Sequence, residues 1–362
     1  MMITDVTAEA YRLPLARPWD GGVAHNDLIV VTVDTDTGAR GTGFAWTPRV
    51  GGGAVAALLR EDCPEALLGQ PVQPAPRWTE LRHHLREAGA GGITAMALAA
   101  VDVALWDLAA RASDSPLVDH IGRHRTSAAA YGSGINLDYS RDALLEQVRR
   151  WLGAGHDAVK IKVGSADTDR DVDRVATVRR LIGPRRRLML DANQRWDLPT
   201  AEHALRRLAR FDPYWIEEPL PADQLAAHQR LRQRCGVPIA VGENLRTVGE
   251  FEEYLRAGAC DIAQPNVVRV GGITPFLRVA QTAAATGVPV APHLLPELSA
   301  QLALCVPLVS MVEDIEDASF AALGALAQPS GVTIEAGTVR CATGPGHGLV
   351  FSPAAMQRRP PP

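Results

Sequence analysis

The sequence predicts a parallel α/β barrel preceded by a smaller α+β unit. From residue 128 onward, eight short apolar segments alternate with amphipathic helical patterns. Before residue 125 the order is different, because three β-branched stretches come first and helical patterns follow them. Alternating strands and helices indicate a parallel sheet, and a count of eight favours a closed barrel over an open doubly wound sheet.

The first unit, about residues 1–125, begins with strand patterns in "ITDVTAEAYRLPL", "DLIVVTVDTDTG" and "GTGFAW". The turn "DTDTGARG" predicts a hairpin between the last two. Helical patterns follow in "VGGGAVAALLREDCPEALLG", "PAPRWTELRHHLREAG" and "GGITAMALAAVDVALWDLAARA", the last with apolar residues at helical spacing. A sheet followed by helices is typical of an α+β domain.

The barrel unit, residues 126–320, contains all eight predicted parallel strands. They lie near "SAAAYGSGI", "AVKIKV", "RRLMLD", "YWIEE", "PIAVGE", "DIAQPN", "PVAPH" and "SMVE", with helices such as "DALLEQVRRWLGAG", "DVDRVATVRRLIG" and "TAEHALRRLARF" between them. The tail, residues 321–362, returns to turn-rich and extended patterning in "GVTIEAGTVRCATGPGHGL". We expect this tail to pack against the first unit.

Charge and cysteine usage exclude several kinds of partner. The 362 residues carry 37 basic and 41 acidic side chains, a net charge of -4, with no long basic tract. Nucleic acid and anionic membranes are therefore poor partners.

The N-terminal residues lack a basic segment followed by a long apolar one, and no run approaches a membrane span. Five scattered cysteines without a C-x-x-C pair predict reduced thiols, so we expect a cytoplasmic protein.

Polar residues stand at the C-terminal ends of the predicted barrel strands. Successive members of this set are 29, 26, 26, 23, 27 and 20 residues apart, about one β/α unit each. Active sites of barrel enzymes lie at this rim, so the set predicts a ring of side chains around one cavity. The ring consists of Lys162, Asp191, Glu217, Glu243, Asn266, His293 and Glu313.

Three carboxylates on consecutive strands predict a metal site. Asp191, Glu217 and Glu243 would repel one another in a pocket without a compensating charge. Oxygen ligands with no cysteine nearby favour a hard divalent cation, Mg²⁺ before Mn²⁺. The alternative is that each acid merely ends a strand or caps a helix. Spacing alone leaves the choice between Glu217 and Glu218 open.

The strand "AVKIKVG" places Lys160 and Lys162 on one face, because strand side chains alternate. Each ammonium group should lower the pKa of the other, so that one is neutral near pH 7 and able to act as a general base. The alternative is that both lysines pair with carboxylates or extend to solvent. His293, on a later strand, would reach the cavity from the other side, although most single histidines are ordinary polar residues.

At this point the sequence resembles the enolase superfamily and, within it, the mandelate racemase group. The resemblance rests on "AVDVALWDLAARA", "VKIKVG", "LMLDANQRW", "WIEEPL", "VGENL", "QPNVVRVGGIT", "APHLLPELS" and "MVEDIE", which occur in the expected order. It implies a modified (β/α)7β barrel, with an α+β capping domain built from the N-terminal region and completed by the C-terminal tail. It also implies a homo-oligomer.

The resemblance implies a role for each rim residue. Mg²⁺ would be held by Asp191, Glu217 and Glu243. Lys162 would be the base, tuned by Lys160, and His293 the second acid/base residue. Proton abstraction beside a carboxylate would give an enediolate, as in this superfamily, whose members use a Lys or His base with Mg²⁺. Asn193 would lie near the metal and the substrate, and Glu313 would hydrogen-bond the substrate carboxylate.

One departure from the family pattern concerns the partner of His293. The group normally has an aspartate where "QPNVVRVGG" has Asn266. The asparagine oxygen would still accept the imidazole N–H, but it carries no charge to stabilise imidazolium, so His293 should be a weak base. A one-base reaction led by Lys162 is then favoured over racemisation. The muconate-lactonising group uses a sixth-strand lysine where this chain has Arg269, a poor base.

The leading hypothesis is a Mg²⁺-dependent acid-sugar dehydratase, a lyase that forms a 2-keto-3-deoxy acid from a small carboxylate substrate. The alternatives are an isomerase (racemase, epimerase or cycloisomerase) and, from another class, a non-catalytic carboxylate-binding protein. Loops of the capping domain around "ARPWDGGVAHND" and "WTPRVGGG" should provide selectivity, with His25, Trp46 and Arg49 as candidates.

Overall fold

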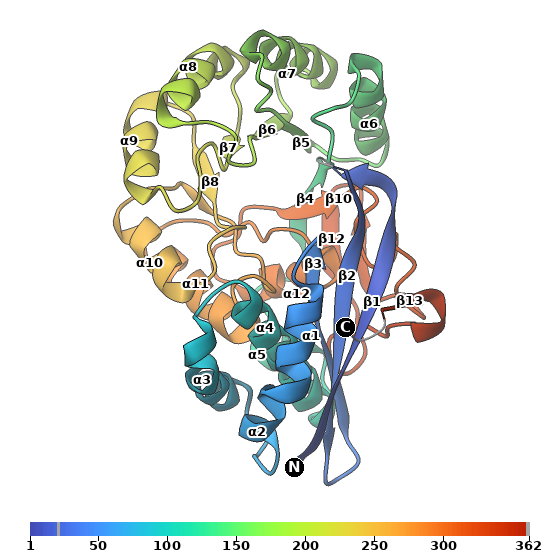
Figure 1. Ribbon diagram of the computed structural model, residues 1–362. Helices are drawn as coiled ribbons and strands as arrows, with labels where there is room; N and C mark the ends of the chain where they lie inside the picture. The colour runs from blue at the N-terminus through green and yellow to red at the C-terminus, as the bar shows by residue number, and fades with distance from the viewer. Residues whose placement is uncertain (20–21, 360–362) are drawn as a thin grey trace.

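The computed structural model describes residues 1–19 and 22–359, and it divides into a cap and a barrel (Figure 1). The cap is built on a four-stranded antiparallel sheet with the order β13-β1-β2-β3. Its strands are β1 (Ile3–Trp19), β2 (Val23–Thr35), β3 (Arg40–Pro48) and β13 (Gln357–Arg358). Its helices are α1 (Gly52–Glu61), α2 (Cys63–Leu67), α3 (Pro74–His84), α4 (Ile93–Ala112) and α5 (Leu117–Ile121).

Two glycines allow α4 to pack directly on β3. A Cβ atom at Gly43 would lie 2.0 Å from the Ala100 carbonyl oxygen, and one at Gly41 would lie 2.3 Å from that of Ala104. Neither distance is possible for a real side chain, so the "GTG" of the third strand is required by the close approach of the helix. The alanine-rich face of α4 supplies the matching small surface.

Helix α4 is the central helix of the cap. By length and composition alone its 20 residues would be apolar enough to cross a membrane, but 83% of the apolar window is buried inside the protein. Two buried carboxylates on this helix bind other parts of the chain. Asp102 accepts hydrogen bonds from the backbone N–H and the hydroxyl of Thr274, and Asp107 accepts from the N–H groups of Thr42 and His347. The "AVDVALWD" motif therefore connects the cap to the barrel and to the C-terminal segment.

The barrel strands form a parallel ladder from β4 to β9, and β10 pairs with β4. Bridges from Ala263 to Val290 and from Val290 to Val309 continue the ladder between β9 and β10, so the strands return to their starting point. The strands are β4 (Ala128–Ser133), β5 (Ala158–Lys162), β6 (Arg187–Asp191), β7 (Trp215–Glu217), β8 (Ile239–Val241), β9 (Ile262–Ala263) and β10 (Val312–Ile315). The helices are α6 (Arg141–Gly153), α7 (Thr168–Ile182), α8 (Leu198–Leu208), α9 (Leu225–Cys235), α10 (Val248–Arg256), α11 (Ile273–Ala285) and α12 (Pro296–Cys305).

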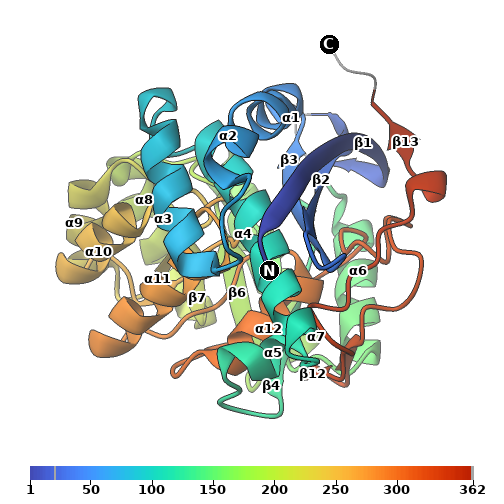
Figure 2. The ribbon, with the colours of Figure 1, turned by 90° about the horizontal axis from the view of Figure 1, so that it is seen from below.

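These observations confirm the predicted fold class. Seven of the eight expected barrel positions carry a strand, whereas "PVAPH" is reduced to the bridges at Val290. Proline at 289 and 292 explains the difference, because proline lacks the N–H that a ladder needs. Figure 2 shows the cap helices α3 and α4 beside α11, where the two units meet.

The tail contacts both units, whereas the expectation named only the cap. Strands β11 (Val332–Glu335) and β12 (Thr338–Cys341) form a hairpin that extends the barrel sheet, with Thr338 opposite Ala129. Only β13 joins the cap sheet, by pairing with β1. The proposed unit boundaries at residues 125 and 320 stay predictions.

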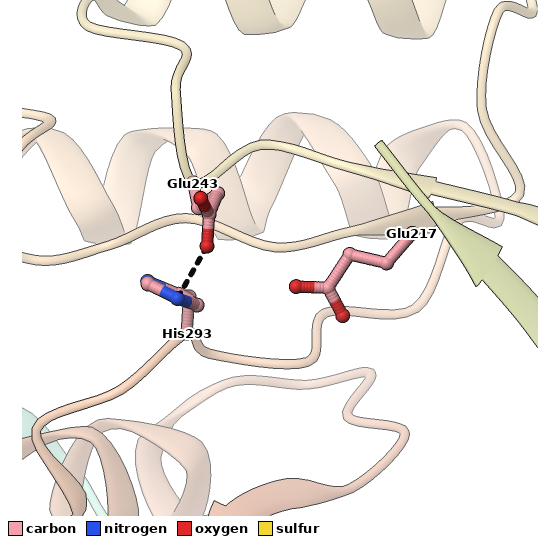
Figure 3. Close-up of side chains that lie close together, drawn as sticks. All are labelled: Glu217, Glu243 and His293. Carbon is pink, nitrogen blue, oxygen red and sulfur yellow. Dashed lines mark ion pairs between the residues drawn. The ribbon is translucent and has the colours of Figure 1, made fainter. Parts of the chain in front are cut away.

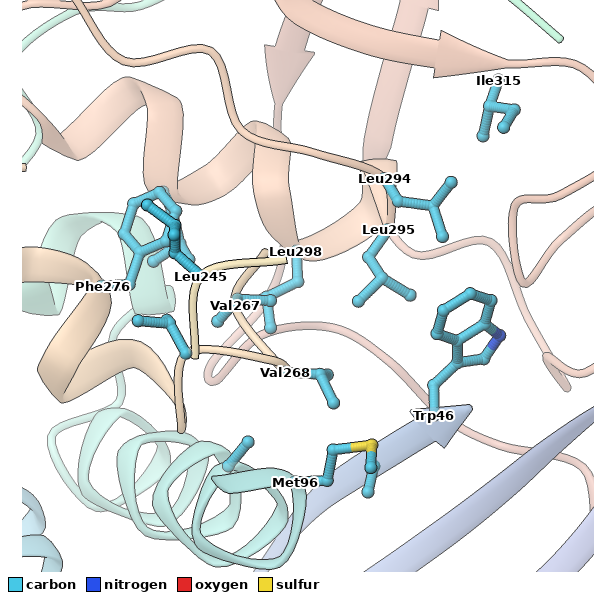
Figure 4. Packing of buried hydrophobic residues seen from close by; sticks show 14 of the residues in the cluster. Trp46, Met96, Leu245, Val267, Val268, Phe276, Leu294, Leu295, Leu298 and Ile315 are labelled. Atoms are coloured by element: carbon cyan, nitrogen blue, oxygen red, sulfur yellow. The ribbon is translucent and has the colours of Figure 1, made fainter. Parts of the chain in front are cut away.

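An apolar cluster fills the space between α4 and the barrel mouth (Figure 4). Trp46 at the end of β3 and Met96 on α4 contribute from the cap. Leu294 and Ile315 contribute from the barrel rim, and all four side chains are buried. This shared core holds the end of β3 over the C-terminal ends of the barrel strands.

Replacing Asp102 with alanine is expected to lower the free energy of unfolding by about 2–3 kcal/mol. The substitution would leave the N–H and the hydroxyl of Thr274 buried without a partner at the start of α11. Urea unfolding followed by circular dichroism measures the loss. The matched control, Glu61→Ala at the exposed end of α1, should change stability by less than about 0.5 kcal/mol. Equal stability of the two variants would contradict the linking role of Asp102.

Candidate active site

Strand register brings three rim residues into one row. Lys162 pairs in register with Asp191, and Asp191 with Glu217, across the parallel strands β5, β6 and β7. Neighbouring strands are about 4.8 Å apart, so these side chains meet at the carboxyl end of the barrel. Glu243 follows β8 by two residues, and all four are buried. The structure therefore places the predicted ring around one site.

Both lysines are held by carboxylates. The ammonium nitrogen of Lys160 lies 2.7 Å from Glu217 Oε2 and 2.8 Å from Glu313 Oε1, and Lys162 Nζ lies 2.5 Å from Asp191 Oδ2. Burial alone would lower the pKa of each lysine. At Lys160 the charges of Glu217 and Glu313 outweigh burial and raise the pKa well above its usual value, and at Lys162 the pKa is also raised, chiefly by Asp191.

The prediction that one lysine is neutral near pH 7 is therefore wrong for this arrangement of charges. The charge of Lys160 does act to lower the pKa of Lys162, as expected, but its effect is smaller than that of Asp191. The alternative interpretation, in which both lysines pair with carboxylates, describes the contacts that the structure shows. These carboxylates raise the pKa of each lysine.

Glu217 has an oxygen atom without a partner. Its Oε2 accepts hydrogen bonds from Lys160 and Gln264, whereas its Oε1 is buried and makes no hydrogen bond within the described residues. Burial, and then the charge of Asp191, raise the pKa of Glu217 to about 7. A buried carboxylate oxygen that faces other carboxylates and lacks a donor is what a cation site requires.

The neighbouring Glu218 is directed toward Asn244. Its contacts bear on the choice between Glu217 and Glu218 as a metal ligand, which spacing alone left open. Its carboxylate accepts hydrogen bonds from the backbone N–H and the side-chain amide of Asn244, and its φ is 38°. Burial, followed by the charge of Glu243, raises the pKa of Glu218 well above its usual value. Glu217, and not Glu218, contacts Lys160.

His293 lies between two carboxylates of the ring. Its Nε2 lies against the carboxylate of Glu243, the contact drawn in Figure 3, and 4.0 Å from Glu313 Oε2; these contacts are ion pairs only when the imidazole is protonated. The described residues also include a group able to hold a metal, in which one atom each from Glu217, Glu243 and His293 lie within 4.8 Å of one another. Asp191 is outside this group, and its oxygens accept hydrogen bonds from Lys162 and from the N–H of Asn193.

Asn266 holds His293 in a way that corrects the sequence prediction. The amide oxygen of Asn266 accepts from the backbone N–H groups of Val268 and Arg269, both at 3.0 Å. Its NH₂ group therefore faces His293, with Nδ2 3.0 Å from Nδ1 of the imidazole. An NH₂ group only donates, so Nδ1 is the acceptor and the ring proton of neutral His293 resides on Nε2.

Glu313 is an anion in this arrangement. Burial would raise its pKa, but the charges of Lys160 and His293 outweigh it and lower the pKa to about 2. The hydroxyl of Ser133 donates to Oε1, and the backbone N–H of Leu294 donates to Oε2. Sequence reasoning missed Ser133, although its place on an inward face of β4, two residues after Tyr131, was a usable signal.

A cavity of about 220 Å³ opens above these groups. Trp46 lines it, as predicted, and Asn193 does so with the catalytic candidates. Its described lining includes neither His25, which lies half-buried opposite Pro14 in the cap sheet, nor Arg49, which is exposed after β3. The sequence placed Trp46, His25 and Arg49 in loops near the rim, but it could not show which of the three side chains lines the cavity. The lining consists of Trp19, Val23, Trp46, Pro48, Ile135, Lys162, Asn193, Glu243, Arg269, His293, Leu294, Glu313 and Ile315.

A capped barrel with a carboxylate and lysine ring at its carboxyl end defines a class of enzyme. Residues 143–355 match the enolase C-terminal domain-like family, and residues 3–122 match the mandelate racemase / muconate lactonizing enzyme N-terminal domain. The chain therefore belongs to the mandelate racemase / muconate lactonizing enzyme family of the enolase superfamily. The predicted resemblance is confirmed.

Particular relatives cover nearly the whole chain. A 3,6-anhydro-alpha-L-galactonate cycloisomerase from Streptomyces coelicolor is 36% identical over 97% of both chains. The crystal structure of a racemase from Streptomyces coelicolor A3(2) with bound magnesium superposes with a TM-score of 0.91, at 34% identity over 97% of both chains. An L-talarate dehydratase from Polaromonas sp. JS666, complexed with Mg and L-glucarate, has a TM-score of 0.89 at 34% identity, covering 98% of this chain and 97% of that one.

Proposed function

We propose that this protein is a Mg²⁺-dependent enzyme that removes the α-proton of a sugar-acid carboxylate and eliminates the β-oxygen, as an acid-sugar dehydratase does. The observation that carries the proposal is the row of Lys162, Asp191 and Glu217, in which a buried base candidate adjoins carboxylates with an unpartnered oxygen. The related dehydratases and cycloisomerase support the same chemistry.

The donor set fits a hard divalent cation. Asp191, Glu217 and Glu243 offer carboxylate oxygens, and Glu217 Oε1 has no partner within the described residues. Oxygen donors of this kind suit Mg²⁺, with Mn²⁺ as the alternative, better than a softer metal. When bound, the cation would supply positive charge that offsets the carboxylates, acidifies the substrate α-proton and weakens the hold of Asp191 on the Lys162 proton.

The two lysines have different tasks because only one lines the cavity. Lys162 borders the cavity, so it is the base that receives the α-proton. Lys160 is enclosed by Glu217 and Glu313, and its ammonium lies 5.4 Å from the ring centre of Tyr131. These contacts fix Lys160 as a positive charge beneath the base, where it favours the neutral form of Lys162 and attracts a carboxylate substrate.

His293 is suited to donate a hydrogen bond from its Nε2–H group. Since Asn266 donates to Nδ1, the proton on Nε2 is directed toward the ring of carboxylates and the cavity. We assign His293 to the departing β-oxygen as a hydrogen-bond donor, and Lys162 to the α-carbon. Asn193, which also lines the cavity, is assigned to the substrate carboxylate end, and the anionic Glu313 to a hydroxyl group of the substrate. This assignment places no second base on the face of the α-carbon opposite Lys162. Racemisation, which needs a base on each face, is therefore disfavoured.

A cycloisomerase is the second candidate, favoured by the 36% identical relative. The two reactions differ only in whether the β-oxygen, after leaving the β-carbon, is still attached to the rest of the molecule. In a dehydratase the α-C–H bond breaks with transfer of the proton to Lys162, the β-C–O bond breaks, and the leaving hydroxide takes up a proton from solvent to become water. In an anhydro sugar acid the same β-oxygen belongs to a ring, so it takes up the proton and stays attached, and the product is an isomer.

The test is incubation of the purified protein with Mg²⁺ and a panel of hexarates, hexonates, pentonates and anhydrohexonates in D₂O. Formation of a 2-keto-3-deoxy acid marks elimination, and mass change distinguishes loss of water from ring opening. Deuterium uptake with an unchanged skeleton would mark a racemase or epimerase instead. No proton exchange with any member would contradict the proposed function for these acids.

Replacing Asn266 with aspartate is expected to raise proton exchange on the His293 side by about 10-fold or more. An aspartate oxygen would accept Nδ1–H and stabilise the protonated imidazole, which the present NH₂ group opposes. NMR in D₂O, with the α-epimer of the accepted substrate, measures the exchange. Asn266→Ala, which removes the donor without adding charge, is the control, and equal exchange in both variants would contradict this role.

We further propose that the enzyme is cytoplasmic and a homo-oligomer. All five cysteines are unpaired, and four of them are buried, in agreement with a reducing compartment.

A further inference from the structure

We call the polar residues that line the cavity its polar wall and the apolar residues its apolar wall. The polar wall is formed by the rim groups Lys162, Asn193, Glu243, Arg269, His293 and Glu313. The apolar wall is formed by Trp19, Val23, Trp46, Pro48, Ile135, Leu294 and Ile315. Because α-proton removal occurs beside Lys162, the remainder of a bound substrate must extend along the apolar wall.

Two tryptophans dominate the apolar wall. The rings of Trp19 and Trp46 lie 5.9 Å apart between centroids and are tilted by 51°. Figure 4 shows Trp46 at the end of β3 with Leu294 and Ile315 across from it, so aliphatic side chains of the barrel complete the surface. Such a surface packs well against C–H groups and a flat ring, and it offers few partners to hydroxyl groups.

The cationic side chains that line the cavity within the described part of the chain are already engaged on the polar wall. Lys162 pairs with Asp191, and Arg269 donates to the Glu243 carbonyl oxygen and to Asn244 Oδ1. Arg269 Nη1 also lies 3.6 Å from Glu243 Oε1. A second carboxylate at the far end of a substrate would therefore be buried against Trp19 and Trp46 without a compensating charge, which is costly.

We infer that the substrate is a monocarboxylate whose α-carbon is attached to a compact ring with few hydroxyl groups, packed on Trp19 and Trp46. This inference rests on the proposed function for the position of the reacting carbons. It assigns Trp19, Trp46 and Ile135 as specificity-determining residues and places diacids among the poor substrates.

The test compares three acids that share the same reacting end: a 3,6-anhydrohexonate, the open-chain hexonate and the hexarate. We expect kcat/KM to fall in this order, by at least about 100-fold between the first and the last. Trp46→Ala should reduce the preference at least about 10-fold, whereas Trp46→Phe, which keeps an aromatic surface, should preserve it. Ile135→Arg, at a half-buried loop position, should raise hexarate turnover by supplying the absent charge.

Binding to the Lys162→Ala variant, measured by calorimetry with Mg²⁺ present, separates selectivity from chemistry. The anhydrohexonate should bind more tightly than the hexarate, whether or not the wild-type enzyme converts it. If the hexarate binds or reacts at least as well, the inference is overturned while the proposed function stands. If the binding order holds and no acid loses its α-proton, the proposed function fails instead.

Discussion

Replacing Lys162 with alanine is expected to reduce α-proton exchange by about 10²–10⁴-fold, the usual contribution of a general base. Lys162 is the lysine that borders the cavity within the described chain, and its ammonium is 2.5 Å from Asp191 Oδ2. Lys160 is unable to replace it, because Glu217 and Glu313 enclose its ammonium group. NMR measurement of deuterium incorporation at the α-carbon in D₂O gives the rate directly, without assuming which product follows.

Two controls distinguish loss of the base from loss of structure. Arg185→Ala, at an exposed position near the N-terminal end of β6, should leave the exchange rate within about twofold of the wild type. The Lys162→Ala variant itself should retain the circular dichroism spectrum and the thermal midpoint within a few degrees. Retention of more than about a tenth of the wild-type rate would show that another group removes the proton.

Replacing Glu217 with glutamine is expected to weaken Mg²⁺ binding by at least about 100-fold, more than the loss of an outer contact to a metal ligand usually costs. The substitution keeps the shape of the side chain but removes its charge, at the position where Oε1 has no partner within the described residues. A neutral amide is a much weaker ligand for a hard cation than a carboxylate. Calorimetric titration with Mg²⁺ alone measures the change without any substrate.

The adjacent acid provides a matched control. Glu218→Gln makes the same chemical change one residue away, where the side chain accepts hydrogen bonds from Asn244. We expect its Mg²⁺ affinity to stay within about threefold of the wild type. A larger loss for Glu218→Gln than for Glu217→Gln would assign the metal to the other acid and reject the site as described.

The positions of the ring residues were predictable because strand periodicity is local. Lys162, Asp191 and Glu217 follow apolar segments at about one β/α unit from each other, and the parallel register then aligns them. The order of motifs from "AVDVALWD" to "MVEDIE" was sufficient for the family as well. The seventh strand was less predictable in extent, because prolines on both sides of Val290 limit its hydrogen bonds to bridges.

Charge states and hydrogen-bond directions were not predictable in the same way. Lys160 and Glu217 are 57 residues apart in the chain, and their contact determines the direction of the lysine pKa shift. The orientation of the Asn266 amide depends on two backbone N–H groups of its own loop, which take its oxygen and leave NH₂ for His293. A residue type alone indicates neither contact.

By itself the sequence determined the barrel, the capping domain, the family and the ring of rim residues, since periodicity and residue spacing along one strand decide which face a side chain occupies. The tertiary structure decided which groups the ring residues contact, which acid has an oxygen without a partner within the described residues, and which side chains line the cavity. Trp19 and Trp46 come from the cap, and Leu294 and Ile315 come from the barrel. Only packing of the two units brings these side chains to one cavity, and that packing depends on contacts distant in the chain.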